Sequence, residues 1–377
     1  MAIGWSGSNG GITKNQKMIF VGDLQQEIFI QKYTYPMEVS YFVNNMCNLR
    51  CKHCYVAYKD NKNALTVEEW KNTFDKLISM GARTFGNVGK EPTLTWNKTR
   101  ELLSYFKEKR KTIPRLRFGF VTNGILLDNS KVKDLENIQP DYIDISLDGT
   151  RKTNDQIRGT GSYDRTINNL KILSEYKILE KVFISFTVNR FNIPTIDELV
   201  DTLYDLGFKK LLFSPYVTRD KTDKLYIVDT EIIKWAENLL AGKVIDFSKY
   251  RGLNIYLKND YTTTRNLMEN LEQKGIIDKH NLLIDDYGVI FNKYTFNGND
   301  IYFNYLPWDD FLAKAIRISH DGYVSNCFDM FFPEYPERAI GNVRVNAINE
   351  ILQNHAKLTK KPKTAPCYSD KHKHIFV

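Results

Sequence analysis

Three of the five cysteines in this chain lie close together, in the run Cys47-Asn-Leu-Arg-Cys51-Lys-His-Cys54. Thiolates are soft, anionic ligands of the kind that iron–sulfur clusters and zinc require. Three of them in one short loop hold three irons of a [4Fe–4S] cubane and leave the fourth iron open to a chelating ligand. The alternative is a structural zinc site completed by His53 or a distant residue, although such sites usually pair two C-x-x-C knuckles and no second pair is present.

The elements that must position this loop alternate regularly along the sequence. Strand-like runs are predicted at residues 37–43, 83–89, 116–124, 142–149, 181–189 and 210–217. Helices are predicted between them at residues 66–81, 99–111, 162–176 and 195–207. The first helix opens on a capping box, Thr66 with Glu69 three residues later. Its spacing predicts one apolar stripe, made by Trp70, Phe74, Leu77 and Ile78.

This alternation predicts right-handed crossovers and a parallel sheet over residues 37–217. An open doubly wound sheet and a partial barrel both satisfy the pattern, and in both the ligands gather at the C-terminal ends of the strands. We expect residues 1–36 to be a lead-in and residues 218–310 to be irregular, with helices near 230–241 and 263–274. Residues 311–377 form a third region, with a short helix near 347–357.

With its cysteine loop directly after the first strand, the chain resembles the radical S-adenosylmethionine (SAM) enzymes over roughly residues 37–217. The resemblance implies an α/β fold, a partial (β/α)6 TIM-like barrel with a C-terminal α+β extension. It also implies two cofactors, one [4Fe–4S] cluster held by Cys47, Cys51 and Cys54, and SAM bound at the open iron. His53 stands where the family commonly has an aromatic residue near the adenine.

The second strand ends in Gly86-Asn-Val-Gly89-Lys90-Glu91-Pro92. The family form is Gly-Gly-Glu-Pro, whose backbone and Glu receive the SAM ammonium group. Gly89, Glu91 and Pro92 match it, while Lys90 replaces the second Gly. Taken alone, the run is also compatible with a plain Gly-Pro turn before a helix.

Polar residues at the other strand ends complete the SAM site that the resemblance implies. Asn123 belongs to a Thr-Asn-Gly motif after the third strand, although Asn-Gly is also a common turn. Ser146 and Arg158 are assigned to the SAM carboxylate, with Asp148 beside them, because the forked Arg guanidinium suits a carboxylate. The residues assigned to the nucleoside, which simple strand termination also explains, are Thr187, Asn189 and Ser214.

The segment from Ile318 to Val343 resembles the SPASM or twitch extension of peptide- and sugar-modifying radical SAM enzymes, which holds one or two auxiliary [4Fe–4S] clusters. Cys327 and Cys367 fit two of its cysteine positions. Asn346 and Asp370 stand where further cysteines belong, and two thiolates do not complete a standard four-cysteine cluster.

Three interpretations of this extension stay open. The first is an auxiliary [4Fe–4S] cluster with a non-cysteine ligand from Asp329, His372 or His374. The second is a degenerate extension without a cluster, in which Cys327 or Cys367 could donate a hydrogen atom to a substrate radical. The third is a pair of buried structural cysteines.

The composition is that of a globular protein, with 42% hydrophobic and 26% charged residues. We expect no membrane span, because no run of about 18 apolar residues occurs. The N-terminus lacks the apolar core of a secretory signal, which predicts a cytoplasmic location. The net charge of +8 is dispersed rather than gathered in a Lys/Arg block, so a nucleic-acid partner is not expected.

The resemblance implies a radical SAM oxidoreductase or maturase. Such an enzyme cleaves SAM reductively to a 5′-deoxyadenosyl radical, which abstracts hydrogen from a peptide or natural-product substrate and leads to cross-linking, oxidation or epimerisation. It needs a one-electron reductant such as flavodoxin or ferredoxin. Residues 1–36 are too short for the leader-recognition domain of many peptide maturases, which makes a ribosomal peptide substrate less favoured without excluding it. A sugar or aminocyclitol substrate is the second enzymatic possibility. From another class, a nonenzymatic, zinc-stabilised interaction module is the alternative.

Overall fold

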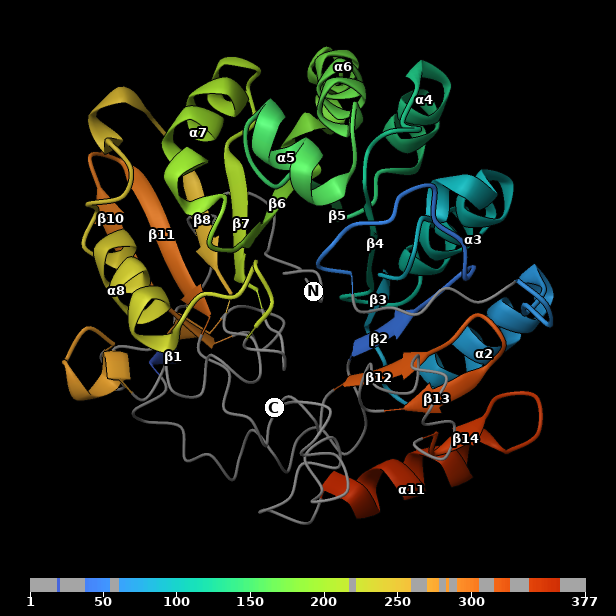
Figure 1. Ribbon diagram of the computed structural model, residues 1–377. Helices are drawn as coiled ribbons and strands as arrows, with labels where there is room; N and C mark the ends of the chain where they lie inside the picture. Colours follow the sequence, from blue (N-terminus) through green and yellow to red (C-terminus); the bar gives the residue numbers. More distant parts are fainter. Residues whose placement is uncertain are drawn as a thin grey trace.

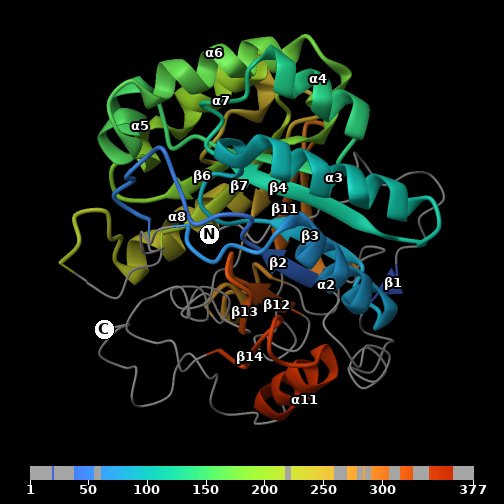
Figure 2. The same cartoon turned by 90° about the vertical axis from the view of Figure 1, so that its right-hand side faces the viewer.

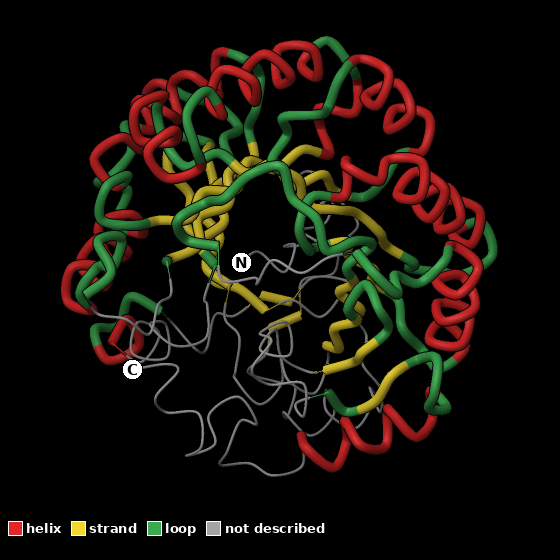
Figure 3. Tube along the Cα trace, turned by 45° about the vertical axis from the view of Figure 1, so that its right-hand side comes forward, coloured by secondary structure: helices red, strands yellow, loops and turns green. Residues whose placement is uncertain are grey.

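The computed structural model describes residues 19–20, 38–54, 61–216, 222–258, 270–277, 283–284, 290–304, 315–325 and 339–359. Parallel strands form an arc that helices cover on its outer side (Figures 1 and 3). The strands of the predicted core are β2 (Glu38–Tyr41), β3 (Thr84–Asn87), β4 (Arg117–Thr122), β5 (Tyr142–Ser146), β6 (Val182–Val188) and β7 (Lys210–Pro215). The helices that alternate with them are α2 (Val67–Ser79), α3 (Trp96–Arg110), α4 (Asn129–Ile138), α5 (Arg151–Arg158), α6 (Ser162–Ser174) and α7 (Ile196–Asp205).

The sheet continues past β7 with β8, β11, β10, β9 and β1, and past β2 with β12, β13 and β14. The first of these strands on each side, β8 and β12, is parallel to its neighbour in the core, and so is β11 to β8. The two ends of the sheet do not pair with each other in the described residues, so the barrel is partial, as predicted. The bounds are β1 (Ile19–Phe20), β8 (Asn254–Leu257), β9 (Leu283–Ile284), β10 (Ile290–Phe296), β11 (Asn299–Asn304), β12 (Ala315–Ile318), β13 (Tyr323–Ser325) and β14 (Gly341–Asn342).

The prediction that residues 218–310 are irregular is wrong where the structure describes them. They contain β8, β10 and β11 as well as α8 (Asp229–Leu240), which confirms the helix expected near 230–241. The helix expected near 263–274 lies largely outside the described residues. Between β10 and β11, Asn297 and Gly298 have φ of 50° and 75°, the left-handed conformation of a tight hairpin turn. That Asn-Gly pair is the sequence signal for the hairpin.

The C-terminal region is joined to the barrel through the sheet. Strand β12 pairs with β2, and α11 (Ile348–Thr359), predicted near 347–357, lies against α2 and β14 (Figure 2). The Arg344 guanidinium forms an ion pair with Glu69 at 2.6 Å and donates to the Asn63 carbonyl at 2.7 Å. These contacts attach the C-terminal region to residues 63–69, which link the cysteine loop to α2. None of the helices in the described residues is long and apolar enough to cross a membrane.

The outer face of the sheet carries the main hydrophobic core. The predicted stripe of α2 is buried, and its Trp70 and Phe74 rings pack on Tyr41 of β2 with centroids 5.3 and 4.9 Å away. The capping box is present, since the Glu69 N–H donates to Thr66 Oγ1 at 3.2 Å and the Thr66 N–H to the Glu69 carboxylate at 2.7 Å. The capping box sets the start of α2, so its apolar stripe faces the sheet.

The inner face of the sheet carries a separate apolar cluster, here called the inner floor, which includes Tyr142, Phe183, Leu212, Tyr256 and Tyr302. The Tyr142 ring lies across the inner face of β4 and β3. The residues beneath it are Gly119 on β4 and Gly86 on β3. A Cβ at Gly119 would lie 2.4 Å from the Tyr142 carbonyl oxygen, and one at Gly86 would lie 2.5 Å from Tyr142 Oη. These glycines therefore make room for a large side chain inside the barrel.

Gly86→Ala is expected to lower the free energy of unfolding by about 1–3 kcal/mol, because the added methyl group overlaps Tyr142 Oη. Tyr142→Phe removes that oxygen, and the next Tyr142 atom is 3.8 Å from the added Cβ. The double variant should therefore recover most of the loss. Urea denaturation of the four proteins measures the effect, and strictly additive losses would show that the Tyr142 hydroxyl is not the cause.

Candidate active site

The cysteine loop follows β2 and lies across the C-terminal ends of the core strands. The Lys52 N–H donates to the Ile157 carbonyl of α5 at 2.9 Å. The Asn123 side chain donates to Asn48 Oδ1 at 2.7 Å, which ties the loop to the end of β4. The loop is thus fixed at the edge of the sheet where ligands of parallel α/β proteins bind.

The thiols of Cys47, Cys51 and Cys54 are all partly exposed and near enough to influence one another electrostatically. Burial raises the pKa of the Cys51 thiol to about 11 and also raises that of Cys47. The Leu49 N–H donates to Cys47 Sγ at 3.4 Å, as amides around cluster sulfurs do.

A cubane cluster suits this arrangement of thiols. In the described residues no three His, Cys, Asp or Glu side chains converge on a single metal ion. A cubane does not need such convergence, because each thiolate binds a different iron. The three soft donors in one accessible loop therefore fit the cluster that the sequence predicts.

Glu91 is fully buried between the ends of β3 and β4. Its carboxylate accepts from the Thr93 N–H at 3.0 Å, the Thr122 hydroxyl at 2.7 Å and the Asn123 N–H at 2.8 Å. Its own N–H donates to the Met46 carbonyl at 2.9 Å. Glu91 therefore ties two strand ends to the cysteine loop, and the predicted contact of this motif with the SAM ammonium group stays a prediction.

The other positions of that motif show why small or turn-forming residues occur there. A Cβ at Gly89 would lie 2.0 Å from the ring of Phe42, the residue after β2, so the backbone approaches this ring more closely than a residue with a side chain would allow. Lys90 has a φ of 55°, in the left-handed region that a glycine adopts without strain. Pro92 begins the short 3₁₀ helix Pro92–Thr95.

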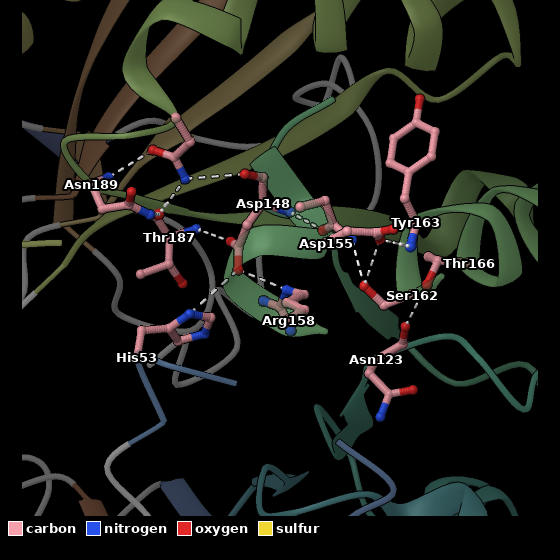
Figure 4. Close-up of polar contacts among 12 residues, drawn as sticks. His53, Asn123, Asp148, Asp155, Arg158, Ser162, Tyr163, Thr166, Thr187 and Asn189 are labelled. Carbon is pink, nitrogen blue, oxygen red and sulfur yellow. Dashed lines mark hydrogen bonds and ion pairs between the residues drawn. The ribbon is translucent and has the colours of Figure 1, made fainter. Parts of the chain in front are cut away.

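Asp148, just beyond β5, connects three parts of the site (Figure 4). Its carboxylate accepts from the Thr187 N–H of β6 at 2.7 Å and forms an ion pair with Arg158 Nε at 2.6 Å. Both side chains of the pair are buried. Burial opposes the charge of the guanidinium, but the negative groups around it, Asp148 first and then Cys51 and Cys54, together outweigh burial and hold the pKa of Arg158 above its ordinary value. Arg158 therefore enters the site as a paired cation, and its predicted contact with the SAM carboxylate stays a prediction.

His53 brings the cysteine loop to this same carboxylate. Its Nδ1 lies 3.6 Å from Asp148 Oδ2, and Figure 4 shows His53 and Arg158 both pointing at Asp148. Burial lowers the pKa of His53 to about 4, so the imidazole is neutral at physiological pH. Its ring meets Tyr216 edge-on with centroids 6.5 Å apart. In this structure His53 packs against the ends of β5 and β7.

Ser146 and Thr187 lie at the C-terminal ends of β5 and β6. Each is four residues beyond a member of the inner floor, so both face the interior of the barrel, because alternate residues share a face. Ser214 also faces inward but only two residues beyond the floor, which places it one layer deeper. Asn189 is fully buried and donates to the Thr187 carbonyl at 2.9 Å, so it holds the turn after β6.

Sequence analysis missed the asparagines that hold this site together. Asn154 Oδ1 accepts from the Asp148 N–H at 2.9 Å, and Asn192 donates to the Asp148 carbonyl at 3.2 Å. The signal for Asn192 is its position in the turn after β6, where a polar side chain satisfies exposed backbone groups, whereas Asn154 lies inside α5 and has no comparable signal. The predicted residues Cys327, Cys367, Asp329, Asp370, His372 and His374 lie outside the described residues.

Comparison with known proteins shows what this chain is similar to. Residues 41–215 match the family model of the radical SAM superfamily. Fe-coproporphyrin III synthase of Methanosarcina barkeri is 34% identical over 189 residues, which is 49% of this chain and 45% of that relative. The antilisterial bacteriocin subtilosin biosynthesis protein AlbA of Bacillus subtilis is 28% identical over 187 residues, 48% of this chain and 40% of that relative. The chain thus spans less than half the length of these curated relatives.

A solved structure shares the fold over most of the chain. Streptococcus suis SuiB bound to the precursor peptide SuiA superposes with a TM-score of 0.62 at 17% identity, covering 92% of this chain and 68% of SuiB. The family implies a SAM-binding [4Fe–4S] cluster, and the cysteine loop supplies ligands of the required type. On the family match, the cysteine loop and the strand ends around it, residues 41–215 of this chain form a radical SAM domain.

Proposed function

We propose that this protein uses a [4Fe–4S] cluster on Cys47, Cys51 and Cys54 to modify a peptide through hydrogen abstraction. The observation that carries the proposal is the thiol loop lying across the strand ends, beside the buried Asp148–Arg158 pair. When bound, the cluster supplies the electron that cleaves SAM into methionine and a 5′-deoxyadenosyl radical. The electron would come from a one-electron reductant such as flavodoxin or ferredoxin.

The protein's own residues position and shield this chemistry. The Asp148 carboxylate orients the neutral His53 ring and the charged Arg158 next to the cysteine loop. Burial of these groups excludes water, which keeps a reactive radical from solvent. Ser146 and Thr187 face the interior above the inner floor, where SAM and substrate would meet. We propose that the SAM contacts are His53, Asp148, Arg158, Ser146 and Thr187, together with Gly89.

A peptide substrate is favoured by the names of several relatives. They include the subtilosin biosynthesis protein, the sporulation killing factor maturation protein of Bacillus subtilis and the mycofactocin maturase of Mycobacterium tuberculosis. SuiB was solved with a precursor peptide. A tetrapyrrole substrate is the second candidate, because two other relatives are named Fe-coproporphyrin III synthase and pre-heme d1 synthase.

Anaerobic reconstitution followed by reduction with dithionite tests the proposed chemistry. We expect a brown protein with broad absorbance near about 400 nm, about four irons per chain and release of 5′-deoxyadenosine from SAM. About eight irons would mean that the C-terminal region holds an auxiliary cluster, whereas about four would support the degenerate extension. A colourless protein with one zinc would overturn the proposal and leave the zinc-stabilised module.

A further inference from the structure

A layer of polar side chains lies inside the barrel, directly above the inner floor. Its members are Asp144, Ser185, Ser214 and Lys258, here called the inner polar layer. Each stands two residues beyond a member of the floor on β5, β6, β7 or β8, so it faces the same interior. Lys258 keeps this register although it follows the last residue of β8, because its N–H donates to the Phe213 carbonyl of β7 at 2.8 Å.

Asp144 is buried in this layer, with 1% of its surface exposed. One carboxylate oxygen accepts a hydrogen bond from the Ser185 hydroxyl, but Oδ2 has no hydrogen-bond partner in the described part of the chain. Burial raises the pKa of Asp144 to about 6, against the Ser185 hydrogen bond and the charge of Lys258, so the group is largely ionised at pH 7. A buried carboxylate oxygen without a donor is costly unless water or a ligand meets it.

Ser214 presents a second open group in the same layer. It is 5% exposed, and its Oγ has no hydrogen-bond partner among the described residues. A hydroxyl donates one hydrogen bond and accepts others. The layer therefore combines an open acceptor on β5 with an open donor on β7, and the cationic Lys258 lies beyond Ser214 on the next strand.

We propose that the inner polar layer binds a peptide group of the substrate, whose N–H donates to Asp144 and whose carbonyl accepts from Ser214. The proposal rests on the proposed function and names the part of the substrate that enters the barrel. An amide carries one donor and one acceptor on a rigid plane, which matches one open group of each kind. The aromatic and aliphatic side chains of the floor lie directly below, so the peptide group stops at this layer, beneath the strand ends that face SAM.

Binding of a capped amino acid to the reconstituted holoenzyme tests this assignment. The probe is N-acetylglycine N-methylamide, and its matched analogue is the ester methyl acetoxyacetate, in which ester oxygens replace both amide N–H groups. Saturation-transfer NMR titrations give both dissociation constants. We expect the amide to bind the wild type about tenfold more tightly than the ester, and Asp144→Ala and Ser214→Ala each to weaken amide binding about tenfold.

Ser79→Ala is the matched control, because Ser79 is exposed on α2 and donates only to the Lys76 carbonyl of its own helix. If Asp144→Ala does not fold, Ser214→Ala gives the same comparison, since it removes one oxygen that makes no hydrogen bond in the described residues. Equal affinity for amide and ester, or amide binding unchanged in Ser214→Ala, would overturn the assignment. Preferred binding of propionate or myo-inositol would also overturn it and indicate a carboxylate-bearing or sugar substrate.

Release of 5′-deoxyadenosine, measured on the same wild-type samples, separates this inference from the proposed function. A protein that cleaves SAM but does not bind the capped glycine retains the radical chemistry and loses the peptide assignment. A protein that does not cleave SAM loses the proposed function, whatever it binds.

Discussion

Cys51→Ala is expected to abolish assembly of the cluster and, with it, reductive cleavage of SAM. Cys51 lies between the other two thiols in sequence, and its neighbours Cys47 and Cys54 cannot hold three irons without it. Iron should fall from about four per chain to less than one, and 5′-deoxyadenosine should fall below detection. Anaerobic reconstitution followed by iron analysis, absorbance near about 400 nm and product chromatography measures the three effects.

Met46→Ala is the matched control for this loss. Met46 precedes the first cysteine, is 36% exposed and offers no thiolate, so its removal should leave iron content unchanged. The far-UV circular dichroism of Cys51→Ala should match that of the iron-free wild type, which excludes misfolding as the cause. If Cys51→Ala still bound about four irons, the cluster would have a different set of ligands and the assignment of this loop would be wrong.

The fold and the cysteine loop were predictable because their signals are local. A capping box, an apolar stripe and short apolar runs specify α2 and the strands of the core without reference to distant residues. The extra strands were not predictable in the same way. β8 is only four residues long, and it becomes a strand because β7 and β11 flank it. Tertiary pairing rather than local propensity decides such segments.

The positions of the site residues were predictable from the strand ends, but their partners were not. Arg158 and Asp148 are ten residues apart, and nothing in the sequence shows that the guanidinium turns back onto that carboxylate instead of remaining open to a ligand. Ser214 likewise matches the strand-end pattern, yet its register places it one layer below Ser146 and Thr187. The direction of a side chain depends on the packed structure, which spacing alone does not give.

Asp148→Ala is expected to destabilise the protein by about 3–5 kcal/mol, because it leaves the Arg158 guanidinium buried without a counter-charge. It also removes the acceptor of the Thr187 N–H. Urea denaturation of the iron-free protein under reducing conditions measures the change. The matched control is Arg151→Ala, which breaks the ion pair with Asp164 at the surface, where both side chains are largely exposed. That change should cost at most about 1 kcal/mol.

A double-variant cycle distinguishes the buried charge from a simple loss of packing. Once Arg158→Met has removed the guanidinium, Asp148→Ala no longer leaves a buried cation unpaired. It should then cost only about 1–3 kcal/mol, for the lost acceptor of the Thr187 N–H. The loss in the double variant should therefore be smaller than the sum of the two single losses. Additive losses would mean that the two side chains stabilise the protein independently. A positive coupling instead would show that each side chain is tolerated in the buried site because the other is present.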